Sequence, residues 1–442
     1  MRRIILMRGS DPLHAAWRAR SITPAADFLA DKVTTPGMNI DAGYHPACLP
    51  GTRRLGGGPM SVKVFNDSVL NQPVHSVSVG PTAYAIRAEF EDDQAIEDLK
   101  NKCSETVIGA YADPTIEPFV FCQGGAVGSK DDVVQQLGLD ALHKDGVTGK
   151  NVRVAIVDTG LDHSRLSAPI IGGWSAIDPN YQPGSTTPPK HGTMCAWDVL
   201  IGAPDAQLLD YALLQSAGET LTGFLSDALK AFDQLIQLLH SAPGPLVVNN
   251  SWGLLDSSED APVGSEENYS ANPNHPFNQI TGALVAAGAD VLFAAGNCGA
   301  DCPFPRCGIN DRGPGKSILG ASSHPDVITV AAVTVQRERL GYSSQGPGVL
   351  CASKPDVAGY CQFIGSGVFP VDAGTSAASP VISGVVAALR QVKSVDALPP
   401  LSMKSVIERT AIDIGGKGWN TDLGYGVVDA RGAYQMLKQS PV

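Results

Sequence analysis

The sequence predicts an α/β protein whose parallel central sheet is covered by helices on both faces and is preceded by a smaller α+β module. Five short, almost wholly apolar runs fit buried strands, at 152–157, 207–213, 245–250, 290–295 and 327–333. Helix-like segments alternate with these runs, which is typical of a parallel sheet buried on both faces. Before residue 123, apolar and polar residues alternate in short stretches, which predicts the smaller module.

The helices of the larger domain are predicted from apolar residues that recur three and four positions apart. The clearest such segment runs from about Thr220 to His240. Further helices fit 277–289, 377–391 and 402–411. A short helix between Asp131 and His143 is expected on the outside of the domain.

The smaller module is expected to combine a few strands with one helix. Strands are predicted at 61–65, 76–79, 83–90 and 107–111. Asp92 or Asp93 is expected to cap a helix. The inner face of this helix would carry three residues at helical spacing, Ile96, Leu99 and Cys103.

We expect three parts along the chain, namely an N-terminal module at 1–123, a linker at 124–130 and the larger domain at 131–442. Residues 1–60 contain no long periodic segment, so no element is predicted there. The linker is expected because the stretch from Gly124 to Lys130 is rich in glycine and other small residues.

The composition is that of a soluble globular protein, with 43% apolar and 17% charged residues. A net charge of -12 argues against nucleic acid or an anionic membrane as a partner. The four apolar residues between Arg3 and Arg8 are too few for a signal-peptide core, and no stretch is long enough to span a bilayer. A cytoplasmic location is therefore expected, with export by a non-standard route as the alternative.

The stretch Gly374-Thr375-Ser376 leads into small, apolar residues that are expected to form a buried helix. Pro380 is expected in the first turn of this helix, where proline costs no hydrogen bond. Ser376 would then lie at the helix N-terminus, where N–H groups and the helix dipole favour developing negative charge. Such a serine is a candidate nucleophile, which needs a base, an orienting carboxylate and an oxyanion donor.

The chain supplies these three groups upstream of Ser376. Asp158 follows the apolar run at 152–157, His191 opens an apolar, helix-like segment, and Asn297 follows the run at 290–295. Because ligands collect at the carboxyl ends of parallel strands, Asp158 and Asn297 are expected at the site. Taken singly, an Asp after a strand is usually a turn residue and a Ser before a helix is usually its cap.

In this order, and with their flanking motifs, these residues resemble the subtilisin-like serine peptidases, or subtilases. The resemblance covers residues 131–437 approximately and includes Asn250-Ser251-Trp252-Gly253, Lys354-Pro355-Asp356-Val357 and Gly424-Tyr425-Gly426. It implies a serine endopeptidase in which Ser376 attacks the peptide carbonyl and forms an acyl-enzyme. His191 would transfer the proton and Asp158 would orient His191, while Asn297 and the Ser376 N–H would stabilise the oxyanion.

The resemblance also implies that the substrate backbone adds as a strand beside Ser251, Trp252 and Gly253. Proteins or peptides are the expected partners, no cofactor is expected to be required, and no metal ligand is assigned. Structural calcium occurs in many similar proteins, but no acidic loop here is specific enough to assign a site. The N-terminal module is placed like a propeptide, so intramolecular inhibition is expected, with a permanent N-terminal domain as the alternative.

Other classes fit the sequence less well. An α/β-hydrolase needs a Gly-x-Ser-x-Gly elbow, and Ala378 occupies the place of the second glycine. The sedolisins use Glu and Asp at the positions of His191 and Asn297. The alternative function from a different class is a catalytically latent, peptide-binding protein of subtilase type. Its usual sign, a lost triad residue, does not occur in this sequence.

The nine cysteines give no single pattern. Three of them closely follow the oxyanion candidate and could form a disulfide that shapes the loop, remain reduced, or hold a metal: Cys298, Cys302 and Cys307. Cys351 and Cys361 could pair across a loop. Cys195 fits a small core residue.

The segment from Leu254 to Phe277 is loop-like and carries five acidic residues and no lysine or arginine. It could favour basic substrates, because the resemblance places it directly after the substrate strand. The other interpretation is a solvated acidic loop without a binding role.

Overall fold

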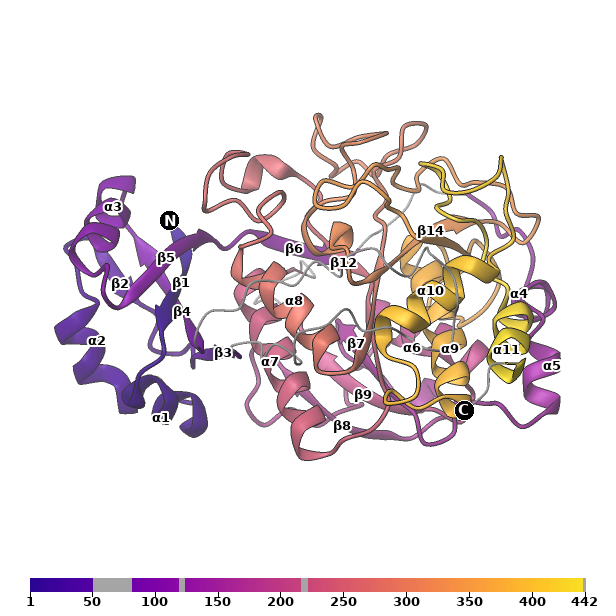
Figure 1. Ribbon diagram of the computed structural model, residues 1–442, viewed down its shortest axis with the longest axis horizontal. Helices are drawn as coiled ribbons and strands as arrows, with labels where there is room; N and C mark the ends of the chain where they lie inside the picture. The colour runs from indigo at the N-terminus through magenta and orange to yellow at the C-terminus, as the bar shows by residue number, and fades with distance from the viewer. Residues whose placement is uncertain (51–81, 119–123, 216–221, 440–442) are drawn as a thin grey trace.

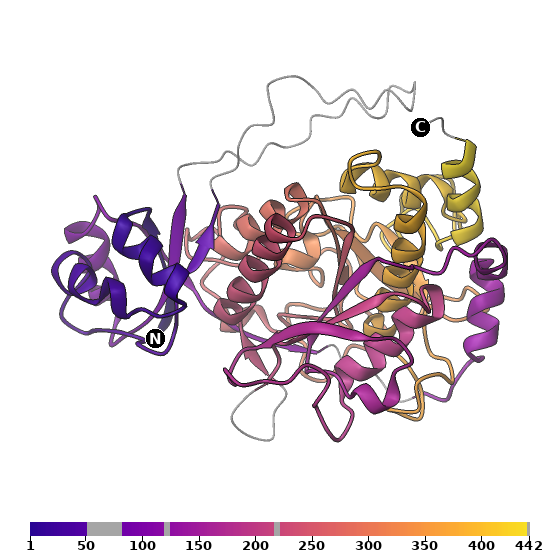
Figure 2. The same ribbon diagram turned by 90° about the horizontal axis from the view of Figure 1, so that it is seen from below.

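The computed structural model describes residues 1–50, 82–118, 124–215 and 222–439. An N-terminal module lies beside a larger domain, next to α7 (Leu225–Ser241) and α8 (Pro276–Ala286), as Figures 1 and 2 show. The predicted strands at 61–65 and 76–79 lie outside the described residues. No helix in the described ranges combines the length and the apolar character that crossing a membrane requires.

The larger domain is built on a seven-stranded sheet with the order β15-β14-β13-β11-β7-β9-β8. All neighbouring strands in it run parallel. Its strands are β7 (Arg153–Asp158), β8 (Ile170–Ser175), β9 (Gln207–Ala212), β11 (Leu246–Asn250), β13 (Ala289–Ala294), β14 (Ile328–Val333) and β15 (Val357–Tyr360). The predicted fold class is confirmed, and each of the five apolar runs forms a strand.

Two strands of this sheet, β8 and β15, carry little sequence signal. β8 contains Gly172 and Gly173, and glycine weakens a strand. A Cβ on Gly173 would lie 2.0 Å from the carbonyl oxygen of Asp210, so the neighbouring strand leaves no room for a side chain. β15 has only four residues and contains Gly359, against which α9 (Thr375–Val392) packs closely as well.

Successive strand residues point to opposite faces of the sheet. In β7, Val154 and Ile156 pack with the helices α6 and α9, whereas Ala155 and Val157 pack with α7 and α8. The remaining helices of the domain lie on the α9 side (Figure 1). Besides α7 and α8, the helices are α4 (Lys130–Leu137), α5 (Leu139–Lys144), α6 (His191–Gly202), α9 (Thr375–Val392), α10 (Pro400–Thr410) and α11 (Ala430–Gln439).

The module contains an antiparallel sheet with the order β2-β4-β1-β5, and β3 also pairs with β4. Its elements are β1 (Arg2–Arg8), α1 (Asp11–Ala19), α2 (Ala26–Lys32), β2 (Met38–Ile40), β3 (Ala47–Leu49), β4 (Ala83–Phe90), α3 (Asp93–Lys102) and β5 (Val107–Ala112). The predicted helix is confirmed, with Asp92 accepting a hydrogen bond from the Ala95 N–H at 2.9 Å. The described residues 1–50 hold three strands and two α-helices where no element was predicted.

β1 escaped prediction because both of its faces are buried, which removes the alternation that marks a half-exposed strand. Ile5 and Met7 pack with the module's own helices. Ile4 and Leu6 belong to the same apolar cluster as α7 and α8 of the larger domain. The central strand of the module therefore also forms part of the contact between the two parts.

The predicted linker contacts the larger domain where it is described. The Gly124 and Gly125 carbonyls accept hydrogen bonds from Nε2 of Gln362 at 3.0 and 3.1 Å. Ser129 caps α4, accepting from the Asp132 N–H while the Asp132 carboxylate accepts from the Ser129 N–H. The division of the chain into 1–123, 124–130 and 131–442 stays a prediction.

Candidate active site

The residues predicted for catalysis come from elements that meet at one edge of the large sheet. Asp158 is the last residue of β7, and Asn297 shortly follows β13. His191 begins α6, and Ser376 lies in the first turn of α9. β7, β11 and β13 are neighbours in the sheet, so their carboxyl ends open on one region, where ligands bind in folds of this type.

Asp158 and His191 are joined by a hydrogen bond. Nδ1 of His191 lies 2.9 Å from Oδ1 and 3.0 Å from Oδ2 of Asp158. Asp158 is fully buried and His191 is 6% exposed, so little water competes for this contact. Because a carboxylate can only accept, the Nδ1 proton is assigned by this contact, which leaves Nε2 of the neutral ring as the proton acceptor.

The start of α6 is tied to the end of β7 by backbone contacts. The Gly192 N–H donates to Oγ1 of Thr159 at 2.9 Å, and the Thr159 N–H donates to Oδ1 of Asp158 at 2.7 Å. A Cβ on Gly192 would lie 2.8 Å from the carbonyl oxygen of Gly160, so this close approach requires glycine. These contacts hold the imidazole and the carboxylate in register.

Ser376 and Ser251 exchange two hydrogen bonds. Oγ of Ser376 donates to the Ser251 carbonyl, and Oγ of Ser251 donates to the Ser376 carbonyl, each at 3.1 Å. Within the described part of the chain, Nε2 of His191 has no hydrogen-bond partner. The Ser376 hydroxyl must therefore turn away from Ser251 before it can donate to this nitrogen, as is common in unliganded sites.

Pro380 lies inside α9, in its second turn, and the prediction that it occupies the first turn is wrong. The helix begins at Thr375, earlier than its apolar segment indicates. Proline has no N–H, so the Ser376 carbonyl four residues earlier lacks its helical donor. The hydroxyl of Ser251 replaces that donor, and Sγ of Cys195 lies 3.5 Å from the same oxygen.

Asn297 is oriented by the beginning of α9. Its Oδ1 accepts from the Thr375 N–H at 3.0 Å and from the Thr375 hydroxyl at 2.9 Å. The donor group of the side chain is therefore Nδ2, the group that an oxyanion would require. Sequence reasoning missed Thr375, whose hydroxyl also accepts from the Gly296 N–H at 3.1 Å.

The predicted substrate strand is paired with a segment of the chain itself. β12 (Trp252–Gly253) pairs antiparallel with β6 (Thr115–Pro118), and β6 pairs on its other side with β10 (Gly223–Phe224). Pro118 lies opposite Trp252, and Glu117 lies opposite Gly253. Sequence reasoning missed β6, because a four-residue strand that ends in proline carries a weak signal.

The three residues predicted to bind substrate differ in what they offer. The Trp252 ring is fully buried between Phe277 and Phe293, with centroids 5.8 and 5.5 Å away, so it belongs to the core. Gly253 has no side chain, and its backbone pairs with a neighbouring strand at Glu117. Ser251 uses its hydroxyl and its carbonyl for hydrogen bonds with Ser376 of α9. A role in substrate binding stays a prediction for all three residues.

A potential metal-ligand group in the described ranges consists of Asp158, His191 and Cys195, whose ligand atoms lie within 4.8 Å of one another. Sγ of Cys195 is 3.7 Å from Nδ1 of His191 and 3.8 Å from Oδ2 of Asp158. Burial raises the pKa of the Cys195 thiol well above its ordinary value, so it stays protonated and neutral. The predicted core position of Cys195 is confirmed, although its contact with the acid–base pair was not foreseen.

The loop after Asn297 is closed by a disulfide between Cys298 and Cys307, one of the three states that the sequence left open. The suggested pairing of Cys351 with Cys361 is wrong, because both are free thiols. Cys361 is instead buried beside Tyr342, with its Sγ 3.4 Å from the phenol oxygen.

The acidic segment after β12 makes specific contacts and is not merely solvated. Asp260 accepts hydrogen bonds from the backbone of Tyr269 and Ser270, which folds the loop onto itself. Glu267 forms ion pairs with Arg3 at 3.1 Å and Lys100 at 2.9 Å, both from the N-terminal module. This loop therefore helps to hold the module.

Comparison with known proteins adds to this geometry. The model of the "Subtilase family" matches residues 149–426, more than half of the chain. Subtilisin E from Bacillus subtilis (strain 168) is 26% identical over 304 residues, which cover 67% of this chain and 68% of that protein. Fervidolysin from Fervidobacterium pennivorans is 27% identical over 332 residues, which cover 69% of this chain and 42% of that protein.

A solved structure supports the fold over nearly the full length. The crystal structure of fervidolysin, described as a keratinolytic enzyme related to subtilisin, aligns with a TM-score of 0.61 at 18% identity. The alignment covers 98% of this chain and 61% of the fervidolysin chain. At this identity the similarity speaks for the arrangement of the elements alone.

Proposed function

Because the chain belongs to the subtilase family and is a serine-type endopeptidase, we propose that it cleaves proteins through Asp158, His191 and Ser376. Ser376 attacks the peptide carbonyl while His191 accepts its proton at Nε2, and Asp158 stabilises the imidazolium that forms. Nδ2 of Asn297 and the Ser376 N–H donate to the oxyanion. His191 then protonates the leaving amine, and water hydrolyses the acyl-enzyme through the same base.

The observation that carries this proposal is the buried Asp158–His191 pair, which leaves Nε2 as a base. The pair lies near Ser376, since Sγ of Cys195 is 3.7 Å from Nδ1 of His191 and 3.5 Å from the Ser376 carbonyl. The test is labelling by a fluorophosphonate together with hydrolysis of denatured casein. We expect labelling at Ser376, and a loss of turnover of about a millionfold in Ser376→Ala if the three residues act as a unit. Ser402→Ala, which removes a buried serine from α10, is the matched control and should keep both activities.

The proposed reaction uses side chains and backbone alone, so it requires no cofactor. Chelation with EDTA should leave kcat/KM unchanged at a temperature well below unfolding. A loss of activity that Zn²⁺ restores while the chain stays folded would contradict this part of the proposal, whereas a loss of folding that Ca²⁺ restores would indicate structural calcium. Labelling at a residue other than Ser376, or undiminished turnover in Ser376→Ala, would contradict the assignment of the nucleophile.

We further propose that the N-terminal module keeps the full-length chain latent. β6 lies between β10 and β12, in the position where a substrate strand would have to bind, so the two compete. The module is held there by polar contacts, among them the pair of Arg87 with Asp227 at 3.4 Å and the bond from Trp17 Nε1 to Asp233 at 2.7 Å. A permanent N-terminal domain and a catalytically latent peptide-binding protein are the alternatives.

Mass spectrometry of incubated wild-type and Ser376→Ala protein separates these alternatives. Loss of roughly the first 120 residues in wild type alone would indicate self-processing of an inhibitory module. Two intact chains, with Ser376 labelled at full rate, would indicate a permanent domain that does not inhibit. Two intact chains without labelling in wild type, even after the module is displaced by mild urea, would favour the peptide-binding alternative.

A further inference from the structure

Glu117 occupies a distinct place in the strand that lies along the site. Neighbouring residues of a strand point to opposite sides. Ile116 is fully buried in the apolar cluster that also contains Trp252, so it points into the domain. Glu117, opposite Gly253, points the other way and meets the loop that follows Asn297.

An arginine on that loop binds the Glu117 side chain. Nη1 of Arg306 lies 2.7 Å from Oε2 of Glu117. The Glu117 side chain is only 12% exposed, whereas Arg306 is 49% exposed. An ion pair with one shielded partner is screened less by water and salt than a fully exposed pair.

The loop that carries Arg306 is held firmly at both ends. Arg306 directly precedes Cys307, which is linked to Cys298 by the disulfide. The Phe304 N–H donates to the Asn297 carbonyl at 2.8 Å, which ties the loop to the proposed oxyanion donor. A loop fixed in this way holds the backbone of Arg306 in place, within reach of Glu117.

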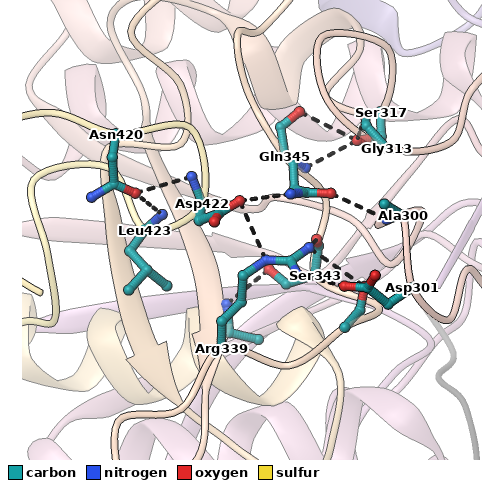
Figure 3. Close-up of polar contacts among 12 residues, drawn as sticks. Ala300, Asp301, Gly313, Ser317, Arg339, Ser343, Gln345, Asn420, Asp422 and Leu423 are labelled. Carbon is teal, nitrogen blue, oxygen red and sulfur yellow. Dashed lines mark hydrogen bonds and ion pairs between the residues drawn. The ribbon is translucent and has the colours of Figure 1, made fainter. Parts of the chain in front are cut away.

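Side chains outside the loop also hold it (Figure 3). Oε1 of Gln345 accepts from the Ala300 N–H at 3.1 Å, and Nε2 of Gln345 donates to Asp422 at 2.6 Å. Arg339 contacts Asp301 at 3.0 Å and Asp422 at 3.5 Å. These contacts connect the loop to the segment that contains Asp422, as the close-up shows.

Among the groups around Glu117, Arg306 is the one that favours a charged carboxylate at this position. Burial raises the pKa of Glu117, nearby Arg306 lowers it, and Glu259 raises it. Without Arg306, a carboxylate at this position would be partly desolvated beside Glu259, and a cationic side chain would be preferred instead.

We propose that Arg306 is a specificity-determining residue that selects Asp or Glu at the substrate position opposite Gly253. The inference rests on the proposed function, in which a substrate strand takes the place of β6. Nothing in the subtilase match assigns such a preference. If Arg306 selects in this way, the preferred substrates are proteins with an acidic residue shortly before the scissile bond.

Hydrolysis of three nitroanilide peptides tests the preference, measured on the protein after the incubation or the mild urea treatment that frees the β6 position. One peptide copies residues 115–119, Thr-Ile-Glu-Pro-Phe, and the others carry Gln or Lys in place of Glu. We expect kcat/KM to be about fivefold higher for Glu than for Gln, and to become equal in Arg306→Gln. In Arg306→Glu the Lys peptide should become the best substrate. Lys316→Gln, which removes an exposed cation from the same region, is the matched control and should keep the wild-type order.

A second readout does not depend on catalysis. In full-length Ser376→Ala, amide hydrogen exchange at Ile116 and Glu117 reports the opening of β6. Arg306→Gln should accelerate this exchange about fivefold, and millimolar Thr-Ile-Glu-Pro peptide should accelerate it more than Thr-Ile-Lys-Pro.

The two readouts separate the failure of the proposals. Equal exchange in Arg306→Gln and its parent, or a greater effect of the Lys peptide, would overturn the role of Arg306 whether or not any peptide is cleaved. An unchanged Glu-to-Gln ratio in Arg306→Gln would overturn it as well. Peptides that displace β6 selectively but are never cleaved, with Ser376 unlabelled, would overturn the proposed peptidase reaction and leave the selection of acidic residues standing.

Discussion

Pro380 follows Ser376 by one helical turn, so the carbonyl of the proposed nucleophile receives its hydrogen bond from the hydroxyl of Ser251 and not from the helix. The first turn of α9 is thereby tied to the strand β11 that precedes Ser251. The position of Ser376 therefore depends on the hydrogen bond from Ser251. This dependence can be tested by giving residue 380 a backbone N–H again.

We expect Ser251→Ala to lower the free energy of unfolding by about 1–3 kcal/mol, because the buried Ser376 carbonyl loses the hydrogen bond from the Ser251 hydroxyl. The double variant Ser251→Ala/Pro380→Ala should recover most of this loss, since an alanine in place of the proline can supply a backbone N–H to the same carbonyl. Urea unfolding of the two single variants and the double variant gives the coupling between the sites. Additive losses would show that the N–H of residue 380 does not reach the Ser376 carbonyl.

Asn297→Asp should lower kcat by about 10²–10³-fold, because the donor Nδ2 is lost while KM changes little. The aspartate keeps the oxygen that accepts from the Thr375 N–H and hydroxyl, so the start of α9 should remain in place. Asn297→Ala removes both functions and should add a loss of stability. Steady-state kinetics and thermal unfolding of the two variants separate the roles, and an Asp variant with wild-type kcat would rule out Asn297 as an oxyanion donor.

The buried ion pair between Arg390 of α9 and Asp290 of β13 should be sensitive to loss of one partner. Both side chains are fully buried, and Nη2 of Arg390 lies 2.6 Å from Oδ1 of Asp290. Arg390→Met leaves a buried carboxylate without its cation and should destabilise the domain by about 3–5 kcal/mol. Lys102→Met, at the exposed pair of Lys102 with Asp98, should change stability by less than about 1 kcal/mol.

The contact between module and domain should weaken as pH rises from about 4 to about 6. Asp113 accepts from the Ser226 N–H and hydroxyl, yet its burial raises its pKa from 3.8 to about 6. The docked state therefore binds a proton more tightly than the released state. The docking free energy that this bound proton provides is fully present below the ordinary pKa of Asp113. It is lost as pH rises through the pKa that Asp113 has in the docked state.

Hydrogen exchange in the module as a function of pH, corrected for the intrinsic rate, measures this dependence. Asp113→Asn should reduce the slope of docking stability against pH by about one proton across this range. The groups facing Asp113 include Asp227, which raises its pKa, and Arg87, which lowers it. An unchanged slope in Asp113→Asn would assign the pH dependence to other groups at the contact.

The sequence predicts those parts of the fold that its local patterns encode. The five apolar strands are internal to the parallel sheet, and β-branched runs such as Val152–Val157 identify them directly. β8 and β15 contain glycines at positions where the neighbouring backbone leaves no room for a side chain. The β-branched residues that usually identify a strand are therefore missing there. β1 was missed because its outer face packs in the apolar cluster of α7 and α8. A local sequence pattern does not indicate such packing against distant residues.

The candidate site was predictable in part, because its residues each follow or begin an element that has a strong local signal. Asp158 and Asn297 follow apolar strands, and His191 and Ser376 open helices. The contacts of Ser251, Thr375 and Cys195 depend on side-chain orientation across segments far apart in the chain. β6 depends on tertiary pairing with two strands more than a hundred residues later in the sequence.

The two faces of β1 bear on how the protein is made. Residues 2–8 leave the ribosome before their strand partners β4 and β5, which reach to Ala112, so the module's sheet can close only after that residue has emerged. Ile4 and Leu6 then remain without their cover until α7, at residues 225–241, is synthesised. During this interval the nascent module displays an apolar surface, onto which α7 can be laid down before the later strands of the large sheet exist.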